Sequence, residues 1–152
     1  INRWNSAFAM FKRKPVFGWG PGTYSFQYAP FQSAEDLTII STNAGDMGNA
    51  HSEFLGPLSE AGFLGLATFL LLLFVVYYRA TILYYRLPKG ELRVILFFVL
   101  LAFTTYNVNG MLNNFLDTDK ASVPFWSFIA FIMVIDLHWQ KMLKRENQSV
   151  DK

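Results

Sequence analysis

The sequence predicts an all-α fold: a polytopic helical membrane protein fragment with three transmembrane helices and an N-terminal extracytoplasmic loop that contains short helices. Hydrophobic residues make up 53% and aromatic residues 18% of the 152 positions, which is more than a soluble core of this size needs. Residues 63–78 contain no charged residue. Lysine and arginine gather in the connections between the apolar stretches, as they do in membrane proteins.

Three apolar stretches are long enough to span a bilayer. The first covers about 63–86, and the eleven Leu, Phe and Val residues within 63–76 favour insertion by roughly 3 to 7 kcal/mol. Pro88 and Gly90 then turn the chain. A second span is expected at about 94–116 and a third at about 123–139, where Trp126 and Trp139 suit the two membrane interfaces.

The distribution of positive charge predicts the orientation of these spans. The connection 79–93 and the tail after residue 140 carry four Lys or Arg residues each, whereas the short loop 117–122 carries only Lys120. The rule that positive loops stay inside places the connection and the tail in the cytoplasm. We therefore expect an extracytoplasmic loop at 1–62, a membrane domain at 63–139 and a cytoplasmic tail at 140–152.

Composition also excludes some classes of function. The net charge of +2 is too small to indicate nucleic-acid binding, and the absence of cysteine excludes disulfides and thiolate metal sites. No spacing of His, Asp and Glu predicts a metal site. The chain begins at Ile1, in a polar segment without a signal peptide, so we expect a fragment whose upstream part holds further spans and which is inactive alone.

The extracytoplasmic loop begins with a predicted helix at 3–13, which Asn2 can cap and which ends before Pro15. Trp4, Phe8 and Phe11 form one apolar stripe on it, suited to a membrane surface or to a helical bundle. Residues 15–22 hold three glycines and two prolines, which predicts a sharply turned loop. Residues 32–50 are a polar loop, in which only 37–40 suits a short extended piece.

Two residues of this loop are candidates for catalysis. His51 stands on the last polar turn before the first span, and a histidine titrates near neutrality, so it can exchange protons with a substrate at the membrane surface. A structural histidine at a helix start is the alternative. Arg3 stands apart from the basic cluster at 12–14 and offers a planar fork that binds phosphate. A solvated arginine is the alternative.

Other polar and aromatic residues are candidates for substrate binding. Trp19 and Tyr24 can stack on sugar rings or pack the loop against the membrane domain. Glu53 and Glu60, seven residues apart, can form a pair of carboxylates on one helical face or be solvated at the interface. Asn107 and Asn114, with Gly110, recur on one face of the second span, where amides join helices or line a site for polar lipid headgroups. Ser52 is too close in sequence to His51 to form a nucleophile–base pair with it.

The order of these motifs resembles the C-terminal part of the O-antigen ligase/polymerase family. The resemblance rests on Arg3-Trp4, on Pro15-Val-Phe-Gly-Trp-Gly-Pro-Gly-Thr-Tyr24, on His51-Ser-Glu-Phe-Leu55 and on Glu60-Ala-Gly-Phe-Leu-Gly65. It covers residues 1–65 by motif and the remainder by its pattern of spans. The family pattern often has Asn after the histidine, where this chain has Ser52, which leaves the subgroup open.

The resemblance implies a glycosyltransferase of the bacterial inner membrane whose loop faces the periplasm. It implies that Arg3 grips the diphosphate of an undecaprenyl-linked glycan and that His51 activates the acceptor hydroxyl, on lipid A-core or another acceptor. No metal or other cofactor is expected, and the expected partners are these two substrates and membrane lipids. A second arginine of the family would lie upstream of this chain.

Three other classes of function stay open at this point, the first of them with two variants within the same family. A polymerase of the same family would extend the lipid-linked glycan itself, and a pilin-type oligosaccharyltransferase would use a Ser or Thr hydroxyl. A transporter or flippase segment would instead line a path with the asparagines of the second span and use His51 as a gate. A membrane anchor without catalytic activity is the third.

Overall fold

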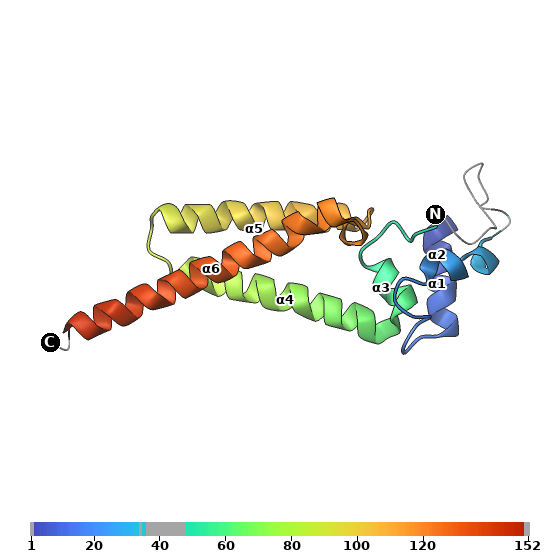
Figure 1. Ribbon diagram of the computed structural model, residues 1–152, viewed down its shortest axis with the longest axis horizontal. Helices are drawn as coiled ribbons and strands as arrows, with labels where there is room; N and C mark the ends of the chain where they lie inside the picture. The colour runs from blue at the N-terminus through green and yellow to red at the C-terminus, as the bar shows by residue number, and fades with distance from the viewer. Residues whose placement is uncertain (1, 34, 36–47, 151–152) are drawn as a thin grey trace.

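The computed structural model describes residues 2–33, 35 and 48–150, and this part of the chain contains helices and no strand (Figure 1). The segment before the long helices, residues 2–60, contains the short elements α1 (Asn2–Arg13), α2 (Tyr24–Gln27), η1 (Ala29–Phe31) and α3 (Leu55–Glu60). Three long helices follow: α4 (Gly62–Arg86), α5 (Glu91–Gly110) and α6 (Asp119–Val150), with the turn η3 (Phe115–Asp117) before α6. Most of the polar loop expected at 32–50, including the piece at 37–40, lies outside the described residues.

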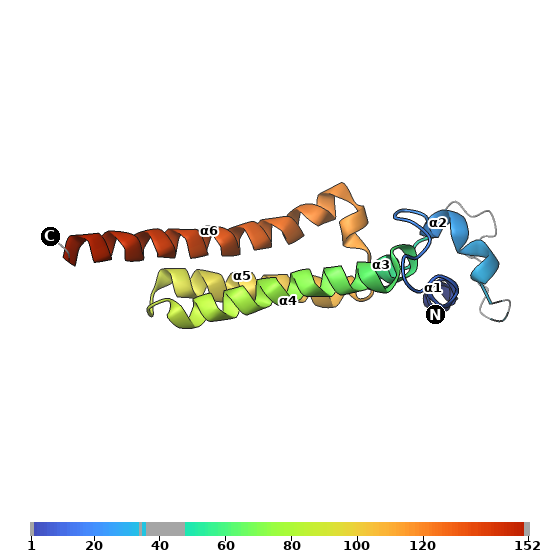
Figure 2. The same ribbon diagram turned by 90° about the horizontal axis from the view of Figure 1, so that it is seen from below.

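All three long helices are apolar and long enough to cross a membrane, which confirms the predicted all-α fold with three spans. α4 and α5 run antiparallel, and α6 lies across one face of the pair in the same direction as α4 (Figures 1 and 2). Phe103 of α5 is fully buried at their centre, against Tyr77 of α4 and Phe125 of α6 at centroid distances of 5.3 and 5.4 Å. Large side chains on the outer faces stay exposed, which suits contact with lipid.

Two helix ends differ from the spans expected at 94–116 and 123–139. α5 ends at Gly110 because Met111 and Leu112 donate to carbonyls three residues back, which closes the helix with a tight turn. α6 continues to Val150 because its polar last turns contain good helix formers, which apolar periodicity does not reveal. Its first turns bend in the part that contains Pro124, whose ring removes a backbone hydrogen bond (Figure 2).

α1 ends at Arg13, as the sequence predicts, but Asn2 is its first residue and not its cap, and its buried face consists of Ser6, Ala7 and Met10. These small or flexible side chains let α1 pack closely against α3. The aromatic stripe turns outward, with Trp4 37% and Phe8 44% exposed. The side chain of Asn2 accepts the N–H of Ser33 at 3.2 Å, so it holds the polar loop.

The glycine-rich loop 15–22 is packed directly on the junction between α3 and α4. Gly20 donates its N–H to the carbonyl of Glu60 at 2.7 Å, and Phe63 donates to the carbonyl of Pro15 at 2.8 Å. Gly18 and Gly62 both have positive φ, and a Cβ on either one would meet backbone atoms of the other segment at 2.4 Å. This close backbone contact fixes α1 and the residues before α3 to the start of the first span.

Candidate functional site

Arg3 and His51, 48 positions apart in sequence, are in direct contact. Arg3 extends from the first turn of α1, and His51 lies in the segment just before α3. The Nη1 of Arg3 hydrogen-bonds to the Nε2 of His51. Because a guanidinium is always protonated, it is the donor, so Nε2 accepts and the imidazole is neutral with its proton on Nδ1. The structure thus brings together the two residues that sequence analysis selected for catalysis.

The surroundings of His51 favour its neutral form. Partial burial, and then the positive charge of Arg3, lower the pKa of His51 below its usual 6.5. Its side chain nevertheless reaches the surface, so a substrate has access to it. The backbone of His51 has φ of 46°, and its N–H donates to Oδ1 of Asn49 at 3.2 Å. A histidine with positive φ is uncommon, and such backbone strain is concentrated at functional sites.

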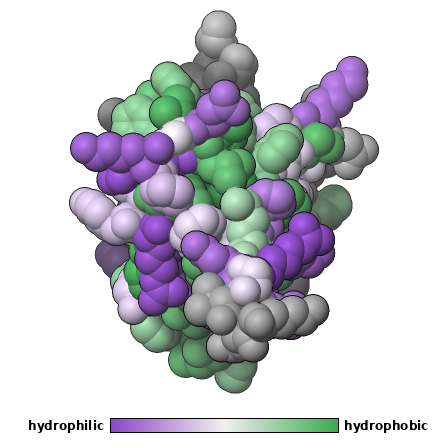
Figure 3. Space-filling model, turned by 90° about the vertical axis from the view of Figure 1, so that its left-hand side faces the viewer, coloured by the Kyte–Doolittle hydropathy of each residue, from purple (hydrophilic) through white to green (hydrophobic). Residues whose placement is uncertain are grey.

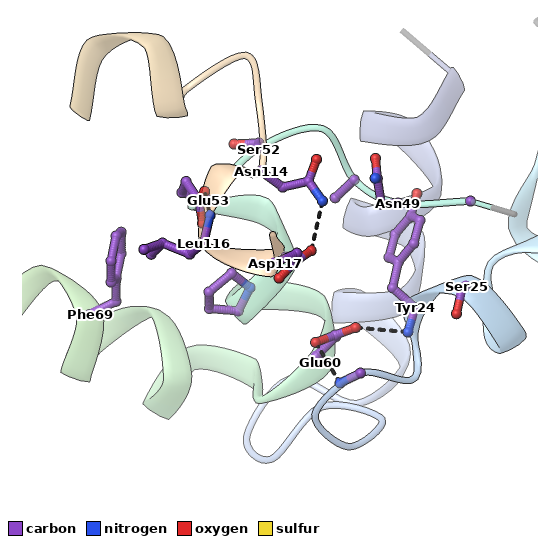
Figure 4. A pocket seen from close by; sticks show the side chains of 15 residues that line it. Tyr24, Ser25, Asn49, Ser52, Glu53, Glu60, Phe69, Asn114, Leu116 and Asp117 are labelled. Atoms are coloured by element: carbon purple, nitrogen blue, oxygen red, sulfur yellow. Dashed lines mark hydrogen bonds between the residues drawn. The ribbon is translucent and has the colours of Figure 1, made fainter. Parts of the chain in front are cut away.

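Tyr24 holds the backbone of Arg3 through a hydrogen bond. Its hydroxyl donates to the backbone carbonyl of Arg3 at 2.6 Å, and its ring stacks on Tyr28 at 5.4 Å. Only 3% of Tyr24 is exposed, and burial raises the pKa of its hydroxyl. The carboxylate of Glu60 accepts the N–H groups of Gly22 and Tyr24, both at 2.9 Å (Figure 4). Sequence analysis did not foresee this role of Glu60, because nothing local in the sequence indicates a bond over 36 positions.

Trp19 is used in packing. Its indole N–H donates to the carbonyl of Met10 at 3.0 Å, and its ring meets Phe31 edge to face at 5.4 Å. The ammonium of Lys14 lies 4.1 Å from the ring centroid. These contacts favour the packing interpretation of Trp19 over sugar stacking, and they hold the end of α1 against the loop.

A cavity of about 330 Å³ lies beside the segment that carries His51 (Figure 4). Its walls include Tyr24, Glu53, Glu60, Asn114 and Asp117, whereas Arg3 and His51 do not line it. Three carboxyl groups around one cavity disfavour a diphosphate there. The cavity is therefore acidic, and Arg3 lies outside it.

Glu53 joins the segment before α3 to the turn after α5. It is 6% exposed, its Oε1 accepts the N–H of Leu116 at 2.6 Å, and its own N–H donates to the carbonyl of Gly110 at 2.8 Å. The pair of carboxylates expected on one helical face does not form, because α3 begins only at Leu55. Burial raises the pKa of Glu53 to about 7, and the nearby charge of Asp117 adds to this effect.

This raised pKa predicts how stability depends on pH. Between about 4.5 and 7 the folded state holds a proton on Glu53 that the unfolded state has released, so stability falls as pH rises. We expect a loss of roughly 1 to 3 kcal/mol across this window. Glu53→Gln keeps an acceptor for Leu116 and should remove most of the slope. Thermal unfolding in detergent from pH 5 to 8 measures it, with Glu146→Gln in the exposed end of α6 as the control. An unchanged slope in Glu53→Gln would contradict the assignment.

The two asparagines are not on one helical face, because α5 ends between them. Asn107 donates its amide to the carbonyl of Phe103 at 2.7 Å, within its own helix. Asn114 follows the helix, donates to Asp117 at 2.6 Å and lines the cavity. Among the residues that the structure describes, no group of three or more His, Cys, Asp or Glu side chains could hold a metal ion.

Comparison with known proteins relates the part of the chain that holds this site to a family. Residues 1–70 match the family model described as O-antigen ligase. This part of the chain is thus similar to the O-antigen ligase family. The match confirms the resemblance found in the motifs and includes both Arg3 and His51. It covers just under half of the chain and ends within α4. No curated protein and no solved structure matches the chain.

Proposed function

We propose that this protein is a glycosyltransferase that moves a glycan from undecaprenyl diphosphate to an acceptor hydroxyl, on the periplasmic side of the bacterial inner membrane. The observation that carries the proposal is the contact between Arg3 and His51 within the residues that match the O-antigen ligase family. A cation suited to phosphate and a neutral imidazole are in contact, within the part of the chain that precedes the first span. This is where a lipid-borne diphosphate sugar would present its reactive carbon.

The reaction is a direct displacement at the anomeric carbon of the donor. The Nε2 of His51 takes the proton from the acceptor hydroxyl while the oxygen forms a bond to that carbon. The bond between carbon and diphosphate breaks, and undecaprenyl diphosphate leaves with the electron pair. Arg3 stabilises the negative charge that develops on the leaving group. Attack from the side opposite to the leaving group inverts the configuration of the anomeric centre.

Arg3 and His51 are coupled before the reaction starts. In the structure the guanidinium of Arg3 occupies the Nε2 that the base needs. A diphosphate is a stronger partner for the guanidinium than a neutral imidazole, because the bond is then formed between opposite charges. Donor binding therefore draws Arg3 away and frees Nε2 for the acceptor. The Nε2 of His51 therefore becomes available for proton transfer only after the donor has bound.

A polymerase of the same family would use the same residues, with a second lipid-linked glycan as its acceptor. A transporter is less well supported, since Asn107 and Asn109 donate to carbonyls four residues back in α5 and so are engaged within their own helix. The contact between Arg3 and His51 lies at the end of the molecule that carries α1 and α3 (Figure 1).

The proposal is tested with the full-length protein reconstituted in liposomes, with an undecaprenyl-diphosphate glycan and a lipid A-core acceptor. We expect the glycan to appear on the acceptor with inverted anomeric configuration. A longer lipid-linked glycan instead would identify the polymerase. If no glycan transfer occurs while the glycan crosses the bilayer, the enzyme proposal fails and the transporter reading takes its place.

A further inference from the structure

A groove of about 390 Å³ runs between α4 and α6, on the part of the molecule away from the Arg3–His51 pair. α4 lines it with Leu72, Val75, Val76, Arg79 and Leu83, and α6 repeats the same spacing from Ile129 to Gln140. The two helices run in parallel, so equivalent positions lie at equal depth (Figures 1 and 2). Each wall is apolar for about two turns and then becomes polar, at Arg79 on α4 and at Asp136 on α6.

A second cavity of about 190 Å³ adjoins the polar end of the groove. The two cavities share Arg79 and Asp136, and the second adds Arg86 and Trp139. Arg79 donates to Oδ2 of Asp136 at 2.5 Å, and Gln140 donates to Oδ1 of the same carboxylate at 3.1 Å. Both oxygens of Asp136 are thus engaged, whereas the side chain of Arg79 is 58% exposed and keeps other N–H groups free for a ligand.

The charge at this end is positive. Two arginines and one carboxylate line the second cavity, which leaves a net charge of +1. Arg86 is exposed and forms no ion pair among the residues that the structure describes. Hydrophilic side chains also gather at this end of the molecule, around an apolar body (Figure 3). An anion is therefore attracted to the same place where the apolar groove ends.

Helix length places these arginines on either side of the boundary between hydrocarbon and lipid headgroups. Arg79 follows Gly62 by about 26 Å of helix and Arg86 by about 36 Å, whereas the hydrocarbon core of a bilayer is about 30 Å thick. Trp139 lies beside them, and tryptophan prefers the membrane interface. The apolar part of the groove then lies within the hydrocarbon region.

We propose that this groove binds one anionic phospholipid, with an acyl chain between α4 and α6 and its phosphate on Arg79 and Arg86. A soluble anion would leave the apolar walls empty, and a lipid without net charge would not use the arginines. The polyprenyl donor does not fit this site, because its diphosphate is assigned to Arg3 at the other end of α4. The lipid belongs to the leaflet opposite to the one that carries the donor.

The test measures lipid retained by the purified full-length protein in native mass spectrometry, with phosphatidylglycerol and phosphatidylcholine as probes. We expect one phosphatidylglycerol to be retained in preference to phosphatidylcholine. Arg86→Gln should reduce this preference roughly fivefold, since one arginine near the surface contributes about 1 kcal/mol to binding an anionic lipid. Arg93→Gln is the matched control, because Arg93 lies on α5 against Tyr84 and outside the groove.

A second variant tests the acyl-chain part of the groove. Val75 lines it and is 46% exposed, so Val75→Trp fills the space without disturbing the core. This variant should retain neither lipid while its helix content in circular dichroism stays unchanged. Equal retention of the two lipids by the unmodified protein, or retention that neither Arg86→Gln nor Val75→Trp reduces, would overturn the proposal. Another helix of the same protein would then be the occupant.

Discussion

Glycan transfer by His51→Asn is expected to fall by about 10² to 10⁴-fold, the usual contribution of a general base. Asparagine is the suitable replacement because the backbone at this position has φ of 46°, which asparagine tolerates and alanine does not. The variant keeps a polar side chain beside Arg3 but cannot take a proton from the acceptor. The measurement is the initial rate of transfer in liposomes at saturating donor.

His138→Asn is the matched control, because His138 is exposed in α6 at the other end of the molecule. It should retain full activity, and both variants should insert into membranes normally. The activity of the unmodified protein should also decline in acid, at a lower pH than an ordinary histidine would give, since the pKa of His51 is lowered and the imidazole must be neutral to act. Full activity of His51→Asn would refute the assignment of the base.

Arg3→Gln is expected to reduce transfer by about 10² to 10³-fold, as the loss of one preorganised electrostatic contact to a transition state does. Glutamine keeps a hydrogen-bond donor but loses the charge that neutralises the leaving diphosphate. Arg3→Lys should recover only part of the activity, because an ammonium cannot form the planar fork. Rates measured over a range of donor concentrations separate an effect on donor binding from one on the chemical step.

Arg13→Gln serves as the control for Arg3→Gln, since Arg13 is an exposed arginine in the last turn of the same helix. Its loss should leave transfer unchanged. A rate for Arg3→Gln equal to that of the unmodified protein would mean that another cation binds the diphosphate.

The sequence predicted the three spans because apolar runs without charge have few other uses. It also predicted α1, where Pro15 sets the end of the helix, and it selected Arg3 and His51 through the order of the motifs. The end of α5 at Gly110 was missed: a tight turn at Met111 and Leu112 closes the helix there, and the carbonyl of Gly110 accepts the N–H of Glu53, more than 50 positions earlier in the chain. Long-range backbone contacts of this kind leave no periodic pattern.

Among the secondary candidates, local patterns were less informative. Glu60 binds the turn before Tyr24 and Glu53 binds the turn before α6, so two similar glutamates perform different tasks. Trp19 looked suited to sugars, yet its indole N–H is already bonded to Met10. A polar or aromatic residue in a loop is expected to make a contact. Which residue it contacts depends on the fold, and the local sequence does not show it.

The most direct test of the central claim is a double-mutant cycle on Arg3 and His51, with glycan transfer as the readout. If the two side chains act as one unit on the lipid diphosphate, Arg3→Gln combined with His51→Asn should lose about as much activity as the more damaging single variant. Losses that multiply, so that the double variant shows the product of the two separate defects, would contradict the account.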